Sequence, residues 1–435
     1  GVNRAGWIVG FQKVTFDATG VAAGETMLTI TDTANRTALD WNALTAAGTA
    51  RGIDLIYHEK GIALSHYTAG SVKSALSADG KSEYDIEAVE AGGTVKRLAY
   101  NSYQFKDART AESSIHNETW GGRSVIGNTT TGNVITVASG THHVVYGGWT
   151  SGSGSKAAAE NRGDSTYNKV TVDGTETVSE DVYGGMTTVA DGKASHNEVT
   201  INKGVTLNGH GYVYGGSTDD GSSADNNKVY LNGIRTPGTV YGGTAANGTA
   251  NGNEVHLNGA TVTGPVYGGA ANGTGNLLSV KGVNRAGKIA GFQKLHFDAT
   301  GVAAGETMLN LNGSAGTTLD RGAIDATGST VNGGITLLHN ANGITVNGLA
   351  ADDNILKSET DATTEKNIAV HRTGGNITDI RYEGYHFADV TTAVTTPTEI
   401  YGGISKAGNS THDNVITVNG AYANVYGGHT SGAGT

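Results

Sequence analysis

The chain has 435 residues, a formal charge of −11 at pH 7, 68 glycines, three prolines and no cysteine. The acidic balance argues against a nucleic-acid partner, which would need a basic surface, and the lack of cysteine excludes disulfides. Glycine this abundant with almost no proline is not typical of a disordered linker, because aliphatic residues recur here at regular spacing and can form a core.

The first thirty residues return 281 positions later. GVNRAGWIVGFQKVTFDATGVAAGETMLTI from Gly1 becomes GVNRAGKIAGFQKLHFDATGVAAGETMLNL from Gly282, with 24 of the 30 residues unchanged. A period long enough to hold many strands predicts a stack in which each unit covers the next. We expect a first unit over residues 1–281 and an incomplete second unit over residues 282–435, continuous as one rod.

Both copies contain FDATG, with Asp17 in the first and Asp298 in the second. A repeated carboxylate is compatible with the catalytic acid of a polysaccharide-cleaving β-helix. An active site normally occurs once in a rod, whereas a turn recurs with each copy, so the sequence favours a turn formed by Asp-x-Thr-Gly.

A second, shorter period is marked by an aromatic residue followed by two glycines. The aromatic residues are Trp120, Tyr146, Tyr183, Tyr214, Tyr241, Tyr267, Tyr401 and Tyr426. Most intervals fall between 25 and 31 residues, and the longer one after Tyr146 predicts a loop over residues 150–166 that leaves the rod.

Between most of these markers lies Asn-x-aliphatic-x-aliphatic. The asparagines are Asn133, Asn168, Asn197, Asn227, Asn253, Asn276 and Asn414. Alternate residues of a strand share a face, so each asparagine and its two aliphatic neighbours point inward while residues such as Lys169, Glu198 and His256 face solvent.

Several copies end in Asn-Gly or Asp-Gly, which also join antiparallel strands in hairpins. The regular spacing instead predicts an all-β parallel β-helix of about 25 residues per coil, where each strand pairs with its counterpart one coil away. At about 4.8 Å per coil, the chain would form roughly 17 coils and a rod of about 80 Å.

Two hypotheses remain open for each repeated residue. The asparagines can form a side-chain amide ladder or, less readily, a carbohydrate-binding row. The aromatic residues can form an exposed strip with open ring faces that binds sugars or proteins, or their rings can stack and shield the strands beneath. No catalytic, metal or cofactor site is expected, and His142-His143 is read as an exposed strand end.

The motif order resembles the passenger repeats of autotransporter (type V secretion) proteins, in particular the hemagglutinin-like and adhesin passengers of Gram-negative anaerobes. AGxIxGFQK with FDATG and GETML, the GI segments from Gly52 and Gly334, and tandem VYGG with N-x-V-x-[VIL]-x-G carry the resemblance. It implies a right-handed parallel β-helix on the bacterial cell surface. It also implies export signals and a membrane anchor, which would lie outside this segment.

We therefore expect a non-enzymatic, extracellular structural or adhesive rod. Its expected partners are unidentified glycans or proteins of host or bacterial surfaces, or other copies of the rod, and many weak contacts at fixed spacing would give avidity. A secreted filament in which the solenoid is the polymer is the alternative, and a polysaccharide-degrading enzyme comes third. No atypical cap is visible at either end, so we also expect either a longer protein or rods stacked end to end.

Overall fold

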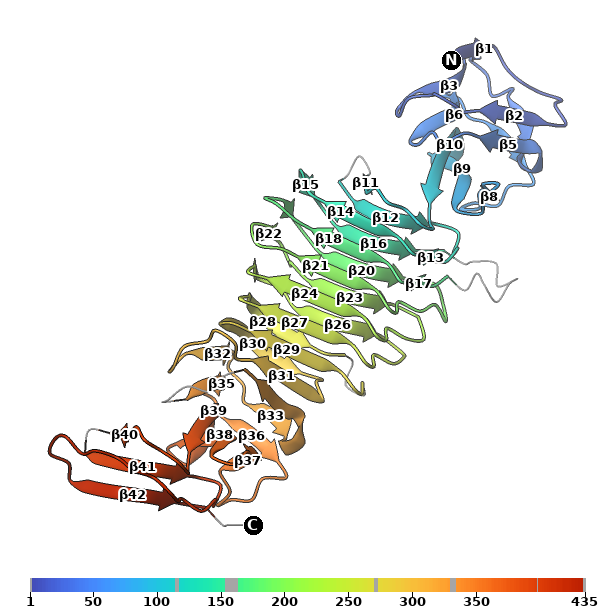
Figure 1. Cartoon of the computed structure of the whole chain (residues 1–435). Coiled ribbons are helices and arrows are strands. Elements are labelled where there is room, and N and C mark those ends of the chain that lie inside the picture. The colour runs from blue at the N-terminus through green and yellow to red at the C-terminus, as the bar shows by residue number, and fades with distance from the viewer. Residues whose placement is uncertain are drawn as a thin grey trace.

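The chain forms a β-solenoid. The computed structural model describes residues 2–113, 117–152, 163–269, 273–328, 334–396 and 398–432. It is all-β and 1% helical, with about 15 turns of stacked parallel strands and roughly 27 residues per coil. The predicted parallel β-helix is confirmed, with a coil slightly longer than expected. The termini lie at opposite ends of an elongated molecule (Figure 1).

The N-terminal coils form a small unit with its own core. Parallel strands β1, β3 and β6 make one face, and the pairs β2 with β5 and β4 with β7 make others. Their bounds are β1 (Asn3–Ala5), β2 (Val14–Asp17), β3 (Thr26–Ile30), β4 (Ala38–Asp40), β5 (Leu44–Ala47), β6 (Ile53–His58) and β7 (Ala63–Ser65), with a 3-10 turn η1 (Trp41–Ala43). Phe16, Trp41, Leu55 and Tyr100 are among the residues buried between them.

The central solenoid is built on two long sheets. The first carries the aromatic-Gly-Gly motifs and runs through β11 (Glu112–Ser113), β12 (Thr119–Ser124), β16 (Val145–Thr150), β20 (Val182–Thr187), β23 (Val213–Thr218), β26 (Val240–Ala245), β28 (Thr261–Tyr267), β30 (Asn284–Ala290), β32 (Thr307–Leu311) and β35 (Ile335–Asn340). The second carries the Asn-x-aliphatic motifs and runs through β14 (Val134–Val137), β18 (Lys169–Val172), β21 (Glu198–Ile201), β24 (Lys228–Asn232), β27 (Glu254–Asn258), β29 (Leu277–Lys281), β31 (Lys294–Asp298) and β34 (Ile324–Thr327).

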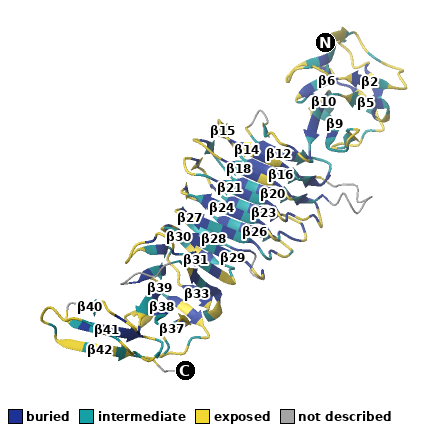
Figure 2. Cartoon of the chain, in the orientation of Figure 1, coloured by how far each residue is buried: buried dark blue, intermediate teal, exposed yellow. Residues whose placement is uncertain are grey.

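Short strands close the remaining sides of the coils. They are β13 (Thr130–Thr131) with β17 (Ser165–Thr166), β15 (Thr141–His142) with β19 (Thr177–Val178) and β22 (Thr206–Leu207), β25 (Arg235–Thr236) with β28, and β33 (Thr317–Asp320) with β36 (Ile344–Asn347). A second 3-10 turn, η2 (Arg321–Ala323), directly follows β33. Inward-facing Val170, Val199, Val229 and Val255 lie one above another in the core, as Figure 2 shows for the buried strands.

Two antiparallel hairpins interrupt the parallel stack, which the sequence interpretation did not anticipate. The first hairpin pairs β9 (Ser82–Ala91) with β10 (Thr94–Gln104), and β8 (Val72–Leu76) adds to it as a third antiparallel strand. The second pairs β38 (Thr364–Thr373) with β39 (Asn376–His386), and β37 (Ile355–Thr360) is its third strand. Gly92-Gly93 and Gly374-Gly375 form the tight turns, and all four have positive φ. Positive φ at both central residues is the geometry that two-residue hairpin turns require.

These hairpins, and not the start of the sequence repeat, divide the cores. The largest core runs continuously from Ile135 to Tyr382. The boundary between residues 281 and 282 falls inside it, since β29 pairs with β31 across that boundary. Each hairpin instead joins one group of coils to the next.

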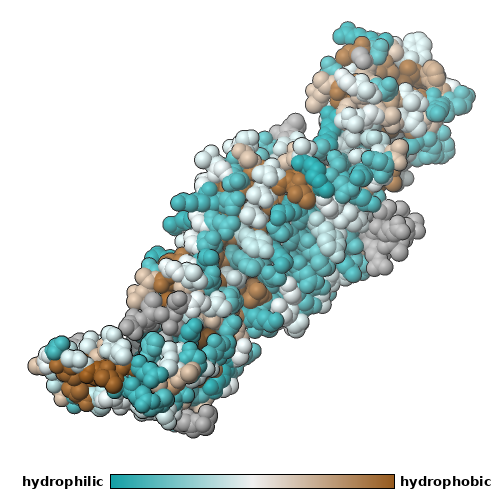
Figure 3. Space-filling model, viewed as in Figure 1, coloured by the Kyte–Doolittle hydropathy of each residue, from teal (hydrophilic) through white to brown (hydrophobic). Residues whose placement is uncertain are grey.

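The last coil is open on its outer side. β41 (Glu399–Ser405) pairs with β42 (Asn424–Thr430) and with β40 (Val394–Thr395), while Asn414 and Val418 lie in irregular backbone. Val415, Val418 and Val425 are exposed, and hydrophobic colour gathers there in Figure 3. The alternation predicted around Asn414 therefore forms no described strand, because no described coil covers it.

The structure also tests the predictions for the FDATG segments, the histidine pair and the loop over residues 150–166. The Thr19 and Thr300 amides donate to Asp17 and Asp298 at 3.0 and 3.1 Å, so both FDATG copies form turns. For the predicted exposed pair His142-His143, His142 is buried and bonded to Thr119, so that assignment is wrong, whereas His143 is exposed. In the predicted loop over residues 150–166, residues 153–162 lie outside the described part of the chain.

Candidate binding surface and the columns that build it

The buried asparagines form a hydrogen-bonded column along the core, here called the asparagine ladder (Asn133, Asn168, Asn197, Asn227, Asn253 and Asn276). From Asn133 to Asn227, each asparagine donates a hydrogen bond from its Nδ2 to the Oδ1 of the next asparagine in the column. The four distances, ending at Asn253, are 2.7, 3.1, 3.2 and 3.1 Å. The preceding backbone amide donates to the same oxygen, for example Asn197 N to Asn227 Oδ1 at 2.9 Å. Buried amides are thereby paired between coils, which removes most of their desolvation cost.

The glycines of the aromatic-Gly-Gly motif make room for this ladder. A Cβ at Gly185 would lie 2.4 Å from Asn197 Nδ2, and one at Gly184 would lie 2.4 Å from the carbonyl oxygen of Gly215. Both glycines therefore face the interior, where the asparagine and the next coil's backbone leave no space for a side chain. The two sequence motifs are halves of one packing contact.

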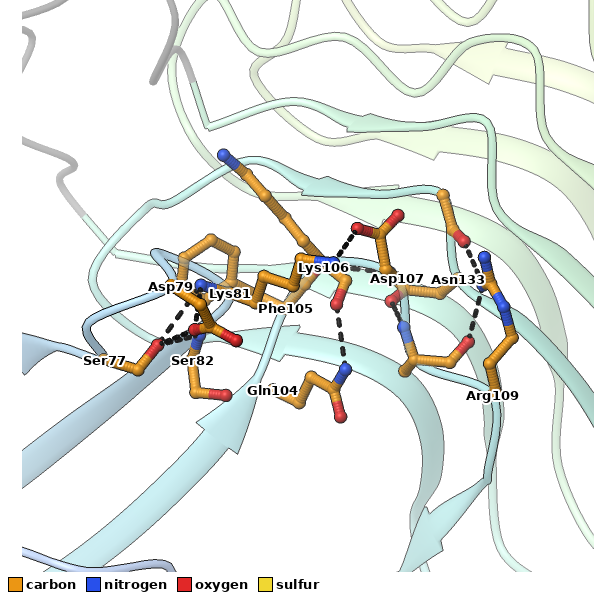
Figure 4. Close-up of polar contacts among 12 residues, drawn as sticks. Ser77, Asp79, Lys81, Ser82, Gln104, Phe105, Lys106, Asp107, Arg109 and Asn133 are labelled. Carbon is orange, nitrogen blue, oxygen red and sulfur yellow. Dashed lines mark hydrogen bonds and ion pairs between the residues drawn. The ribbon is translucent and has the colours of Figure 1, made fainter.

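The ladder starts at the corner between the first hairpin and the first full coil (Figure 4). Asn133 Oδ1 accepts from Ala108 N at 2.8 Å, and its Nδ2 donates to the carbonyl oxygen of Phe105 at 3.1 Å. Lys81 and Asp107 form an ion pair of 2.7 Å beside it. Asn414 makes the same contacts with Val390 and Phe387, so it occupies the equivalent position after the second hairpin.

The ladder ends on a glutamine from the repeated thirty-residue segment. The Asn276 backbone amide donates to Gln293 Oε1 at 3.0 Å, and its Nδ2 donates to the Gly291 carbonyl oxygen. Next to it, a Cβ at Gly268 would lie 2.8 Å from the Phe292 ring. The FQ pair thus closes the asparagine ladder, while the core itself continues through β31 and β34.

The aromatic residues form the tyrosine column (Tyr146, Tyr183, Tyr214, Tyr241 and Tyr267). Successive ring centroids lie 5.2, 4.6, 5.0 and 5.2 Å apart, with interplanar angles of 19° or less. The strand spacing of about 4.8 Å accounts for this, because it brings equivalent rings to stacking distance. The rings cover each other's faces, as in the second of the two hypotheses for these residues, and mainly ring edges are left at the surface.

The other three aromatic markers occupy different surroundings. Trp120 is buried and packs edge-on against Tyr103 from the first hairpin. The Arg123 guanidinium carbon lies 4.6 Å from the Trp120 ring centroid and 4.4 Å from that of Trp149. Tyr401 and Tyr426 stack on each other at 5.0 Å in the last coil. Whether any of these residues binds a ligand stays a prediction.

An acidic group that sequence spacing did not reveal borders the tyrosine column. Asp181 accepts from the Tyr183 hydroxyl at 3.2 Å and from the Tyr212 amide at 3.0 Å, and burial raises the pKa of this carboxyl. Potential ligand atoms of Glu180, Asp181 and His210 lie within 4.8 Å of one another. Since both Asp181 oxygens already accept hydrogen bonds, we infer that Asp181 helps to hold the tyrosine column in place.

The second sheet presents a charged outer face. Lys169 Nζ lies 2.6 Å from Glu198 Oε1, and Lys228 Nζ lies 3.1 Å from Glu254 Oε1, along consecutive coils. Beside them the rings of Tyr230 and His256 stack at 4.4 Å. The sheet with aromatic-Gly-Gly motifs is therefore the less charged of the two outer faces over these coils.

Each hairpin is fastened to the next coil by one buried glutamate. Glu83 accepts from Ser124 Oγ, the Val125 amide and Asn128 Nδ2, all at 2.7 Å. Its counterpart Glu365 accepts from Ser405 Oγ at 2.7 Å, the Lys406 amide at 2.6 Å and Asn409 Nδ2 at 2.7 Å. Sequence periodicity could not find these contacts, because each joins residues that occur once per long repeat. We call the two contact sets the first and second joints.

A groove of about 1530 Å³ lies beside the second hairpin. Its lining includes Arg321, Asp353, His371, Glu383 and Lys406. Most of these charges are paired, with Arg321 to Asp353 at 2.7 Å and His371 to Glu383 at 2.9 Å. The groove is thus a salt-bridged junction.

No protein-family model, no curated protein and no solved structure matches this chain. Among the described residues, no helix is long and apolar enough to cross a membrane.

Proposed function

We propose that this chain is part of an extracellular structural and adhesive rod on a bacterial surface, which makes many weak contacts along its length. The tyrosine column carries the proposal. Its five rings repeat at 4.6 to 5.2 Å on the less charged outer face. Equivalent contacts at fixed spacing can give strong avidity even when each is weak.

The stacked geometry limits the kind of contact. Sugars that need an open ring face have no access between neighbouring tyrosines, so the partner would meet ring edges and hydroxyl groups. Tyrosine combines apolar area with a hydrogen-bonding tip, which suits repetitive protein or glycan surfaces. Export and anchoring would follow the autotransporter resemblance, through segments outside this one.

The test compares three variants of the whole chain. Changing Tyr214, Tyr241 and Tyr267 to Phe keeps the stack and removes the hydroxyls, whereas changing them to Ala removes the rings. A matched control changes Thr171, Thr200 and His256 on the other sheet to Ala. Binding of fluorescent protein to bacterial and host cells and to a glycan array should fall about tenfold or more in the Ala variant and stay unchanged in the control.

A partial loss of binding in the Phe variant would show that the hydroxyl groups contribute part of the binding and the ring edges the rest. Unchanged binding by the Ala variant, with its fold verified by circular dichroism, would make the column purely structural.

A self-assembling filament is a second candidate, favoured by the repeated FQ pair. Phe292 and Gln293 cover the end of the asparagine ladder inside the continuous core, whereas the equivalent Phe11 and Gln12 are exposed in the first copy of the segment. That face has the side chains needed to receive another coil. Electron micrographs of the purified chain should then show fibres with an axial repeat of roughly 50 Å. A monodisperse monomer at high concentration would reject the filament and leave the rod proposal intact.

A further inference from the structure

The two joints differ at one buried position. In the second joint, Asn367 lies two residues after Glu365 on β38 and donates its Nδ2 to Glu365 Oε1 at 2.9 Å. In the first joint, Asp85 lies two residues after Glu83 on β9. The same place in the fold therefore holds an amide in one copy and a carboxyl in the other.

A negative charge on Asp85 would be unfavourable beside the buried Glu83. Both Asp85 and Glu83 are fully buried, and neither Asp85 carboxyl oxygen has a partner within hydrogen-bond geometry among the described residues. The neighbouring Ser74 hydroxyl acts to lower the pKa of Asp85, but burial and Glu83 outweigh it. Glu83 already accepts from three donors, which favours its ionised form. Two neighbouring carboxylates in a buried site cannot both ionise without a large electrostatic cost.

We propose that Asp85 holds a proton at neutral pH, that this proton does for Glu83 what the Asn367 amide does for Glu365, and that opening of the first joint consequently carries a pH dependence that the second joint, with an amide at this position, lacks. The comparison with Asn367 is the main support. A neutral donor at this position satisfies the glutamate in the second joint, and protonated aspartic acid is the form of Asp85 that can donate.

The surroundings of Asp85 favour the protonated form. On its own strand it faces Glu83 and Glu87, and the residues paired with it across the sheet are the uncharged Ser74 on β8 and Asn101 on β10. Burial, followed by the charge of Glu83, raises the pKa of Asp85 to about 8.

Two cations on the packed elements, Arg51 and Arg123, act on the Tyr103 phenol, and the Arg123 guanidinium carbon lies 4.8 Å from the Tyr103 ring centroid. Tyr100 and Tyr103 on β10 interact electrostatically with Asp85, and burial raises the pKa of both phenols, to about 12 for Tyr103. The coil beyond contributes the neutral Ser124 and Asn128 to Glu83. Burial also raises the pKa of Glu83, but its three donors leave Asp85 as the better place for the proton.

The sign of the effect follows from linkage. The pKa of Asp85 is about 8 in the folded joint, above the value of about 3.9 for an exposed aspartate. The folded joint therefore binds a proton that the opened joint releases, and the opening constant rises by up to about tenfold per pH unit between about pH 4 and pH 8. Above the folded pKa the dependence ends, because neither state binds the proton.

The second hairpin serves as an internal reference, and Asp85→Asn is the control for the second hairpin's own ion pairs, such as His371 with Glu383. Amide hydrogen exchange, followed by mass spectrometry and corrected for intrinsic rates, would report opening of residues 82–104 and of residues 364–386 in one sample. Between about pH 6 and pH 8, the opening constant of the first hairpin should rise by up to about a hundredfold relative to the second. A constant ratio would overturn the proposal.

Reciprocal variants assign the effect to this position. Asp85→Asn should remove the extra pH dependence of the first hairpin, and Asn367→Asp should introduce it in the second. If Asn367→Asp does not fold, Asp85→Asn against the wild type decides the matter. An unchanged pH profile in Asp85→Asn would reject Asp85 as the proton site.

Adding calcium tests whether the two carboxyl groups share a proton or bind a metal ion. The same exchange experiment is repeated at about pH 8 with millimolar CaCl2, since paired carboxylates can also bind Ca²⁺. No change on calcium addition is expected. Calcium-dependent protection of the first hairpin that disappears in Asp85→Asn would show that the carboxyl pair binds a metal ion and would overturn the proposal.

Discussion

The tandem coils between Trp120 and Lys281 and the two hairpin joints stabilise the same solenoid by different means. In the tandem coils, asparagine, tyrosine and valine contacts repeat on every level, so each contributes one of several similar terms. In each joint a single buried glutamate accepts hydrogen bonds from a hydroxyl, a backbone amide and a side-chain amide. Repetition spreads stability over many sites, whereas a joint concentrates it in one.

This contrast predicts that the two regions differ in how well they tolerate single substitutions. A coil that loses one asparagine still has neighbours of the same design on both sides. A joint that loses its glutamate leaves several buried donors without acceptors at once. The following variants test how far stability is distributed in one region and concentrated in the other.

The largest effect is expected in the core of the tandem coils. Val255→Asp would bury a carboxylate with no partner between β24 and β29, and should lower the free energy of unfolding by about 4 to 5 kcal/mol. The control His256→Asp lies on the outer face and should cost less than about 1 kcal/mol. Chemical denaturation measures both, and equal losses would contradict the assigned faces.

A joint glutamate should come next. Glu365→Ala leaves Ser405, Asn409 and the Lys406 amide without their acceptor, and should cost about 3 to 4 kcal/mol. Glu359→Ala is the matched control, because that side chain is 60% exposed. Hydrogen exchange should show the loss concentrated around β38 and β41. A uniform loss of protection over the whole chain would show that Glu365 does not stabilise the second joint locally.

One level of the asparagine ladder should cost less. Asn227→Ala removes hydrogen bonds to Asn197, Asn253 and the Ala194 carbonyl, with an expected loss of about 2 kcal/mol. Asn232→Ala, where a half-buried amide bonds to Asn202, should cost less than about 1 kcal/mol. Thermal melting of both variants checks the ranking, and similar melting temperatures would remove the special role of the buried ladder.

The charged outer face should matter least. Lys228→Ala breaks the 3.1 Å ion pair with Glu254 on a side chain that is 43% exposed, and should cost about 0.2 to 1 kcal/mol. The difference from wild type should shrink in high salt, because screening weakens exposed pairs. A loss that persists in high salt would point to packing by the lysine stem.

The solenoid could be predicted because its information is periodic. The spacing of Tyr183, Tyr214 and Tyr241 indicates one coil, and the alternation after Asn197 indicates an inward face. The ladder geometry adds what spacing alone cannot show, namely that Gly185 and Asn197 occupy the same interior space. The stacking of the tyrosine rings was one of two open hypotheses, and its geometry depends on the coil-to-coil distance.

The hairpins and joints escaped prediction because their signals occur once per long repeat. Gly92-Gly93 between two alternating segments is a hairpin signal that could have been used. The contact between Glu83 and Ser124 spans 41 residues, and nothing local in the sequence marks either residue as buried. Such contacts depend on how the hairpin folds back onto the next coil.

The length of a coil, roughly 27 residues, also governs how the molecule is made. Most strand pairs join segments that are only one coil apart in the chain, so a growing stack needs to close only short loops. A newly formed coil presents a row of unpaired backbone groups and an asparagine side chain with free hydrogen-bonding groups. Together they act as a template for the residues that follow. Such a polypeptide can order itself progressively from a first nucleus, with each newly added level setting the register of the next.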